Sequence, residues 1–140
     1  MSAATFAFDS AVAHSGTRSL RVEFDGTENV DFGHVFQYIP VARDTRYHFS
    51  AFVQTQAITT DRGIGFEILD VNHPEQVQVA TAELKGTNDW AVLETDFHTG
   101  PQTDAVKITL RRVPSWKFDN KLSGTVWIDD VELAPIRRTD

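Results

Sequence analysis

The stretch HSGTRSLRVEFDG, residues 14–26, joins a small polar corner to a segment of alternating apolar and polar residues. After the Ser15-Gly16 corner, the alternation sets Leu20, Val22 and Phe24 against Arg21, Glu23 and Asp25. Successive side chains of a β-strand point to opposite faces, so this pattern predicts a strand with one buried face. Gly16 supplies the backbone freedom that a tight corner before such a strand requires.

The same alternation recurs along the whole chain, and turn sequences such as Asp-Gly-Thr, Asn-His-Pro and Thr-Gly-Pro bound the runs. Nine strands are predicted, at residues 3–8, 18–25, 30–39, 45–57, 63–71, 76–82, 90–97, 104–113 and 124–134. Residues 80–86, ATAELKG, could instead form one helical turn. Many short strands at this spacing predict an all-β fold, an antiparallel β-sandwich or barrel.

Composition narrows the class of protein. The 140 residues are enough for one domain, and a net charge of −7 argues against nucleic-acid binding, which needs clustered Lys and Arg. The chain contains no cysteine, which excludes disulfides and thiolate metal sites. No window approaches the ~18 apolar residues of a membrane span, so no membrane insertion is expected. Residues 1–10 lack the features of a signal peptide, and their direct entry into a strand suggests a piece of a longer protein.

Four segments, taken together and in order, follow the pattern of a known family. They are VAHSGTRSLRV (12–22), VFQYIPVARDTRYHFSAFVQ (35–54), GTNDW (86–90) and GTVWIDDVEL (124–133). The chain resembles the carbohydrate-binding modules found beside xylanases and other glycanases, within the galactose-binding-like jelly-roll group. The resemblance covers nearly the whole chain. It implies one jelly-roll module over residues 1–136 with a tail at 137–140, binding a polysaccharide or oligosaccharide within a larger extracellular or cell-envelope bacterial protein.

The family pattern has a further strand, with a Gly-x-Phe-Glu motif, before the first strand predicted in this sequence. The resemblance therefore implies a fragment with an unpaired sheet edge. An unpaired edge can pair with another chain, so self-association through that edge is expected.

The resemblance also implies a structural Ca²⁺. In the family, the first Asp of the last motif holds the ion together with backbone carbonyls of the Ser-Gly corner and a Glu from the first strand, which is absent here. Carried over, Asp129 would supply a carboxylate and Ser15 or Thr17 a backbone carbonyl. Val131 and Leu133 look like core positions, which places Asp129 on the inward side of its strand. The alternative, that Asp129 only accepts hydrogen bonds from backbone N–H groups of the corner, stays open.

Aromatic residues are the candidates for sugar contact, because an exposed ring offers a flat face to pyranose C–H groups. In strand 30–39, inward Val35 and Ile39 would leave the opposite face to Phe32, His34, Phe36 and Tyr38. Trp116 lies in a polar loop, where it either contacts ligand or caps the sandwich. Trp90 and Trp127 are expected to be structural, and Phe52 is expected to point outward.

The strand at 104–113 departs from the xylan-binding relatives. Those relatives carry an outward Tyr and Glu, whereas the outward residues here are Lys107, Thr109 and Arg111. An arginine can bind sugar hydroxyls or an acidic sugar. The residues predicted to bind ligand are therefore His34, Phe36, Tyr38, Arg111 and Trp116.

Catalysis is not expected. The chain has neither G-x-S-x-G nor H-E-x-x-H, and its five histidines show no metal-ligand spacing. Glu94 and Asp96 resemble the start of an E-x-D-x-x-E glycanase signature, but Thr99 stands where the last Glu should be. Glycoside hydrolysis needs a carboxylate pair, and no spacing supplies one. The alternative to a sugar-binding module is a structural or protein-interaction sandwich.

Overall fold

A computed structural model describes residues 4–9, 19–25, 32–58, 63–112 and 123–136. It has nine strands: β1 (Ala4–Asp9), β2 (Ser19–Asp25), β3 (Phe32–Pro40), β4 (Arg46–Ile58), β5 (Gly65–Asp70), β6 (Gln78–Ala80), β7 (Gly86–His98), β8 (Ala105–Arg112) and β9 (Ser123–Pro135). Every predicted strand is present. The largest error in a boundary is at β7, which begins four residues before the predicted position.

The predicted alternative of a helical turn at residues 80–86 is wrong. Leu84 forms an isolated antiparallel bridge with Ile64, with reciprocal backbone hydrogen bonds of 2.8 and 3.0 Å. Pairing with a neighbouring chain segment satisfies these backbone groups, so the local helical preference of the Ala-Glu-Leu-Lys run is overridden.

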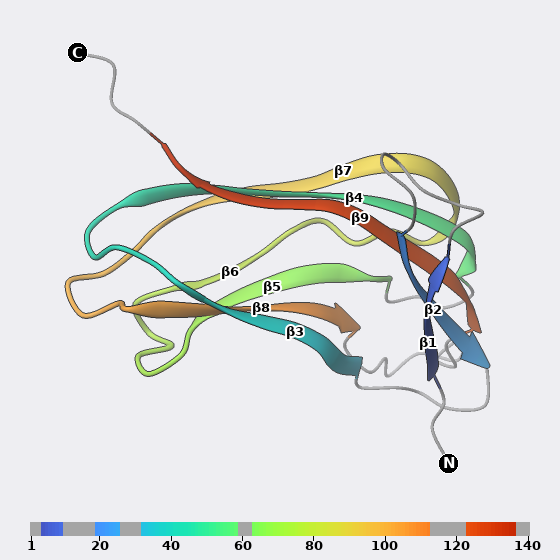
Figure 1. Ribbon diagram of the computed structural model, residues 1–140, viewed down its shortest axis with the longest axis horizontal. Coiled ribbons are helices and arrows are strands. Elements are labelled where there is room, and N and C mark those ends of the chain that lie inside the picture. The colour runs from blue at the N-terminus through green and yellow to red at the C-terminus, as the bar shows by residue number, and fades with distance from the viewer. Residues whose placement is uncertain (1–3, 10–18, 26–31, 59–62, 113–122, 137–140) are drawn as a thin grey trace.

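The strands form two antiparallel sheets that lie face to face (Figure 1). Sheet A has the order β1-β2-β9-β4-β7, and sheet B has the order β3-β8-β5-β6. In Figure 1, β4, β7 and β9 make the upper layer, and β3, β5, β6 and β8 make the lower one. The architecture is therefore the antiparallel β-sandwich that the alternation predicted, with the core between the layers.

The inward residues of both sheets build one apolar core. Fully buried side chains come from β2, β4, β5, β8 and β9, among them Val22, Phe49, Val53, Ile68, Val106 and Val126. Across the two sheets, Phe49 and Phe66 pack edge to face with ring centroids 5.1 Å apart. Burial of this apolar surface, at about 25 cal/mol per Å², is the main force that joins the layers.

One end of the sandwich is fixed by a buried carboxylate. Asp70, at the end of β5, is 2% exposed and accepts hydrogen bonds from the backbone N–H groups of Asn72 and His73. It also accepts one from the Thr103 hydroxyl at 2.7 Å. Burial raises the pKa of Asp70, but these hydrogen bonds outweigh burial and hold the pKa below its ordinary value. The network ties the β5–β6 turn to the β7–β8 loop.

A β-bulge interrupts the alternation of β9. Ser50 of β4 pairs with Glu132 and Phe52 pairs with Asp129, so three residues of β9 span two of β4. Asp130 lies within the bulge and has φ 50°. An extra residue reverses the inward and outward phase of a strand.

The bulge makes two sequence predictions wrong. Val131, predicted to be in the core, is 50% exposed, whereas Leu133 packs against the core as predicted. Asp129 is half-buried and pairs with Phe52, in phase with Trp127 rather than with Leu133. The inward placement of Asp129 therefore does not hold.

Candidate functional site

The outer surface of sheet B collects the exposed aromatic residues of β3. Register pairs Phe36 with Thr109 and Tyr38 with Lys107, and β8 in turn pairs with β5. Residues that share a row across neighbouring strands share a face. We define the sheet B face by its outward residues, Phe36, Tyr38, Glu67, Leu69, Lys107, Thr109 and Arg111.

An aromatic pair stands on this face at its β3 edge. Phe36 is 47% exposed and Tyr38 is 55% exposed, and their ring centroids lie 5.5 Å apart at an interplanar angle of 77°. The outward orientation predicted for both residues is confirmed. Large aromatic rings are usually buried, so two adjacent exposed rings on a regular strand offer a contact surface for a ligand.

Lys107 lies beside the aromatic pair. Its ammonium nitrogen is 4.3 Å from the ring centroid of Phe36 and 5.7 Å from that of Tyr38. A cation at this distance is attracted by the negative face of the ring. The sequence identified Lys107 as outward but did not include it among the ligand-binding residues. Lys107 belongs to the site because it lies opposite Tyr38 on the neighbouring strand.

Arg111 lies on the same face, farther along β8. Its Nε atom is 3.9 Å from a carboxylate oxygen of Glu67, and both side chains are about 30% exposed (29% and 31%). The outward prediction for Arg111 is therefore confirmed. Glu67 was not predicted as a site residue, although its outward position in β5 follows from the alternation of Phe66 and Ile68.

For two of the predicted ligand-binding residues, the structure does not describe the side chain. Trp116 lies outside the described residues, and so does the side chain of His34. Phe32 pairs with Arg112 and Val35 pairs with Leu110, so three steps along β3 match two along β8. This bulge breaks the strict alternation on which a continuous row from residue 32 to 38 depended.

The remaining aromatic predictions concern sheet A. Trp127 is 8% exposed and Trp90 is half-buried, which agrees with structural roles for both. Phe52, predicted to point outward, is half-buried beside Asp129 of β9 and Val92 of β7. The exposed aromatic pair of the sheet B face has no equivalent among these three residues.

An apolar cavity of about 360 Å³ opens between the two sheets, under β3 and beside β9. Its lining includes Leu20, Ile39, Phe66, Ile108, Ile128 and Val131. Asp129 and Ser19 also line it, and they adjoin the Leu20–Ile128 pair of the β2–β9 register.

The calcium prediction is otherwise outside what the structure describes. Ser15 and Thr17 are not among the described residues. Within the described ranges, no three His, Asp or Glu side chains form a cation-binding group. The Asp129 carboxylate accepts a hydrogen bond from the backbone N–H of Asp130 at 2.8 Å.

The sheet edges bear on the predicted self-association. Within the described part of the chain, β3 and β6 end sheet B, and β1 and β7 end sheet A. Self-association through one of these edges stays a prediction.

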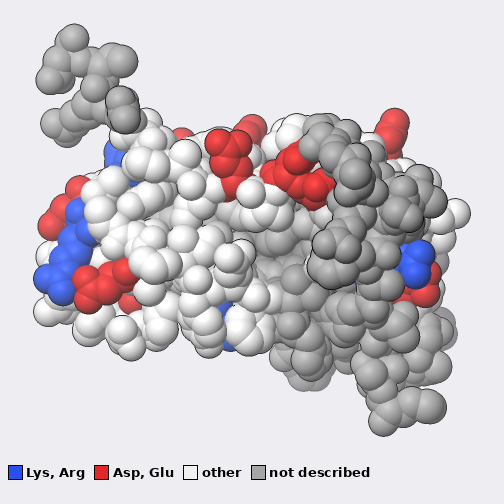
Figure 2. All heavy atoms as spheres, in the orientation of Figure 1, with Lys and Arg blue, Asp and Glu red and all other residues white. Residues whose placement is uncertain are grey.

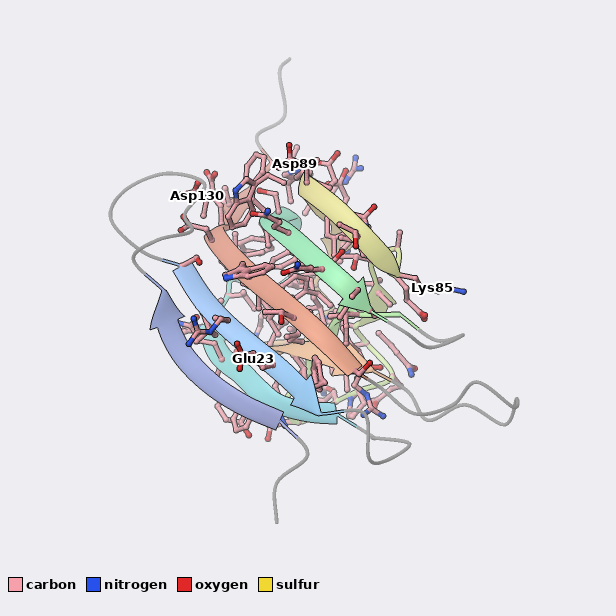
Figure 3. The ribbon with its side chains drawn as sticks, turned by 90° about the vertical axis from the view of Figure 1, so that its right-hand side faces the viewer. Glu23, Lys85, Asp89 and Asp130 are labelled. Carbon is pink, nitrogen blue, oxygen red and sulfur yellow. The ribbon has the colours of Figure 1, made fainter. Side chains whose placement is uncertain are left out.

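The outer surface of sheet A is acidic, and on it two carboxylates contact the ring of His48. The Nδ1 atom of His48 lies 2.5 Å from Asp96, and Nε2 lies 3.2 Å from Glu94. The hydrogen bond to Asp96 raises the pKa of His48 above 6.5; partial burial opposes this, and the negative charges of both carboxylates add to it. Figure 2 shows further acidic side chains over this upper layer, and Figure 3 shows Glu23 on β2 and Asp130 on β9.

Comparison with known proteins defines the class of protein that this fold and surface represent. The profile of a family described as "Carbohydrate binding domain" matches residues 2–114. The chain therefore belongs to this family of carbohydrate-binding modules, as the sequence motifs predicted.

Several solved structures of similar fold are carbohydrate-binding modules. A module titled "Family 16 Carbohydrate Binding Module-2" has a TM-score of 0.63 and 14% identity, over 92% of this chain and 84% of that one. The CBM22-1 xylan-binding domain from Paenibacillus barcinonensis has a TM-score of 0.62 and 15% identity, over 97% and 83%. TmCBM61, in complex with β-1,4-galactotriose, has a TM-score of 0.62 and 15% identity, over 96% and 83%. These similarities confirm the jelly-roll sandwich.

A search of curated protein sequences finds no match to the chain. Among the residues that the structure describes, no helix has the length and apolar character needed to cross a bilayer.

Proposed function

We propose that this chain is a non-catalytic module that binds a polysaccharide or oligosaccharide on the sheet B face. The observation that carries the proposal is the exposed Phe36–Tyr38 pair, which stands on a regular strand next to polar side chains of β5 and β8. Ring faces supply contact area at low entropic cost, while neighbouring polar groups bind hydroxyls. A site on sheet strands is also rigid before ligand arrives, which limits the cost of ordering on binding.

The charges of the two faces support binding without hydrolysis. Glu67 is the one carboxylate among the outward residues of the sheet B face, and it pairs with Arg111. Glycoside hydrolysis requires two carboxyl groups about 5 to 10 Å apart, one of them protonated. Glu94 and Asp96 share one face of sheet A, but both contact His48.

A module of this kind acts within a larger protein. One structural neighbour is the xylanase 10B of Clostridium thermocellum, in which CBM22-1 is joined to GH10; the match covers 94% of the present chain and 24% of the xylanase chain. By analogy, the present module would keep an attached extracellular or cell-envelope domain close to its polysaccharide. Such linkage raises the effective concentration of the attached domain at the polysaccharide, although the module itself makes no contact with the reacting atoms.

A structural Ca²⁺, held by Asp129 with backbone carbonyls of Ser15 and Thr17, belongs to this proposal. The support is that Asp129 and Ser19 line the same cavity and adjoin the paired residues Leu20 and Ile128, and Ser19 follows Thr17 closely in the sequence. Hard oxygen donors of this type suit Ca²⁺. Thermal unfolding in Ca²⁺ and in EDTA tests it: the Ca²⁺-dependent rise in Tm should disappear in Asp129→Asn, and an equal rise in the variant would refute the assignment.

Affinity electrophoresis through gels that contain xylan, mixed-linkage β-glucan or galactan tests the function itself. Wild-type protein should be retarded by at least one of these polysaccharides, and Phe36→Ala and Tyr38→Ala should migrate freely. Val92→Ala is the matched control, because Val92 is 43% exposed on the opposite sheet. Retardation that persists in both aromatic variants would move the site elsewhere. No retardation by any glycan, with the protein folded, would favour a protein-interaction domain.

A further inference from the structure

The charge of this chain is distributed unequally between its two faces. Among the described residues, the outward acidic side chains of sheet A include Glu23, Glu94, Asp96 and Glu132, against Arg21, Arg46 and His48. The outward charged residues of the sheet B face are Lys107, Arg111 and Glu67. Among the described strand residues, sheet A therefore carries the excess of negative charge, and the face with the aromatic pair does not.

Among the charged residues described on the sheet B face, Lys107 has no ion pair with a carboxylate. Within the described residues, the ammonium group of Lys107 makes cation–π contacts with the rings of Phe36 and Tyr38. Its row across the sheet holds Tyr38 on one side and Leu69 on the other, and neither bears a carboxylate. By contrast, a carboxylate oxygen of Glu67 lies 3.9 Å from Nε of Arg111, so the positive charge of Arg111 is already paired with a negative one.

The position of Lys107 suits a ligand that brings a negative charge to the aromatic pair. A cation–π contact attracts the ammonium group without neutralising its charge. A pyranose ring on Phe36 or Tyr38 would lie within a few ångströms of Nζ, and a carboxylate on that sugar could form a charge-assisted hydrogen bond. A neutral sugar offers only hydroxyls, which form weaker bonds to the same donor.

We propose that the sheet B face binds acidic polysaccharides, chains that carry uronic acid residues, and that Lys107 is the residue that recognises the carboxylate. This inference rests on the proposed sugar-binding function and specifies its ligand. Phe36 and Tyr38 supply the stacking surface, and Lys107 selects charged over neutral sugars. Arg111, held by Glu67, is left to bind hydroxyls of a neighbouring sugar unit.

The net charge of −7 does not oppose such a ligand at physiological salt. Packed sheets lie about 10 Å apart, and the acidic side chains of sheet A point away from the sheet B face. The Debye length at physiological ionic strength is about 8 Å, so the field of those carboxylates is largely screened at the sheet B face.

The test measures affinity for matched acidic and neutral polysaccharides. Polygalacturonate, alginate and glucuronoxylan are each compared with the carboxyl-reduced form of the same polymer, alongside neutral xylan and β-glucan, by affinity electrophoresis and isothermal titration calorimetry. Wild-type protein is compared with Lys107→Gln, with Lys107→Arg, which keeps the charge, and with Lys85→Gln. Lys85 is an exposed lysine that extends away from the sheets (Figure 3).

We expect tighter binding to at least one acidic polymer than to its reduced form. Lys107→Gln should weaken binding to the acidic polymer by about fivefold and binding to the reduced form by much less, so that the preference is lost. Lys107→Arg and Lys85→Gln should retain the preference. Raising NaCl from about 0.05 M to about 0.5 M should remove most of the preference of the wild-type protein, because the contact is exposed.

Three results would overturn the inference, and they differ in what they leave standing. Equal binding to acidic and reduced polymers would refute acidic selectivity but keep the sugar-binding function. A preference for acidic polymers that survives Lys107→Gln would refute the role of Lys107. Failure of the folded protein to bind any polymer, acidic or neutral, would remove the sugar-binding function and this inference with it.

Discussion

The ammonium nitrogen of Lys107 lies 4.3 Å from the ring centroid of Phe36, and that ring is nevertheless 47% exposed. Two strands of sheet B therefore present an aromatic ring and a cation together on the outer surface. Phe49, on β4, is fully buried between the sheets. The two phenylalanines differ in what their removal should change, because one contributes to the core and the other to the surface.

The first prediction compares these two residues for stability. Phe49→Ala should lower the free energy of unfolding by about 3–5 kcal/mol, because it removes a buried ring and leaves a cavity against Phe66. Phe36→Ala should cost about 1 kcal/mol or less, because half of the ring is already in water. Urea unfolding followed by tryptophan fluorescence measures both. Equal losses would mean that Phe36 is structural, and the proposed site would lose its main residue.

The second prediction concerns the buried carboxylate of Asp70. Asp70→Ala leaves the Thr103 hydroxyl and two backbone N–H groups without their acceptor, and should cost about 1–3 kcal/mol of unfolding free energy. Asp104→Asn is the control, since the Asp104–Arg43 pair is exposed and should matter much less. A smaller loss for Asp70→Ala than for Asp104→Asn would contradict the role given to the network.

The pH dependence of Asp70 gives a separate check on the same network. Hydrogen bonds lower the pKa of Asp70 in the folded state below 3.8, so its stabilising contribution is present above the unfolded pKa. The contribution is lost as pH falls through the folded pKa. The difference in unfolding free energy between wild type and Asp70→Asn should therefore be largest near neutral pH and shrink below about pH 4. A difference that grows on acidification would contradict this reasoning.

Much of the fold could be predicted from the sequence, because period-two alternation is a local property of each strand. The outward orientation of Phe36 and Tyr38 follows from the inward position of Ile39, and no bulge lies between them. The boundary of β7 was missed because residues 86–89 lack apolar alternation. These residues form a strand because they pair with β4: Asn88 pairs with Thr55, and Gly86 pairs with Ile58.

The failures of strict alternation in β3 and β9 share one cause. Alternation counted back from Leu133 fails at Asp130, and alternation counted from Phe36 fails before Val35, because each stretch contains a bulge. A bulge depends on the pairing of two strands distant in sequence, so a single strand does not reveal it. The importance of Lys107 was missed for a similar reason, since its contact with Phe36 is made between strands.

The third prediction uses the pair of carboxylates around His48. The hydrogen bond to Asp96, with the charges of Asp96 and Glu94, raises the pKa of His48 in the folded state above 6.5, although partial burial opposes the shift. The protonated ring therefore stabilises the fold fully below the unfolded pKa, and the effect is lost as pH rises through the folded pKa. Wild type should exceed His48→Gln in stability near pH 5, and the difference should fall toward zero at about pH 9.

Chemical denaturation at a series of pH values checks this prediction. His98→Gln provides the matched control, because His98 is exposed at the end of the same sheet and has no ion pair with a carboxylate among the described residues. Its substitution should not show the same pH dependence. A difference between wild type and His48→Gln that increases with pH would give the wrong sign and refute the assignment.

The last prediction tests the bulge at Asp130. A non-glycine residue at φ 50° is tolerated best when it is Asp or Asn, whose short polar side chains suit the left-handed region. Asp130→Val places a β-branched side chain there and should cost about 1–2 kcal/mol of unfolding free energy. Asp130→Gly relieves the steric restriction and should change stability by about 0.5 kcal/mol or less. Because the bulge separates the phase of Asp129 from that of Glu132, a valine that is tolerated as well as glycine would contradict the left-handed conformation at Asp130 and the bulge that depends on it.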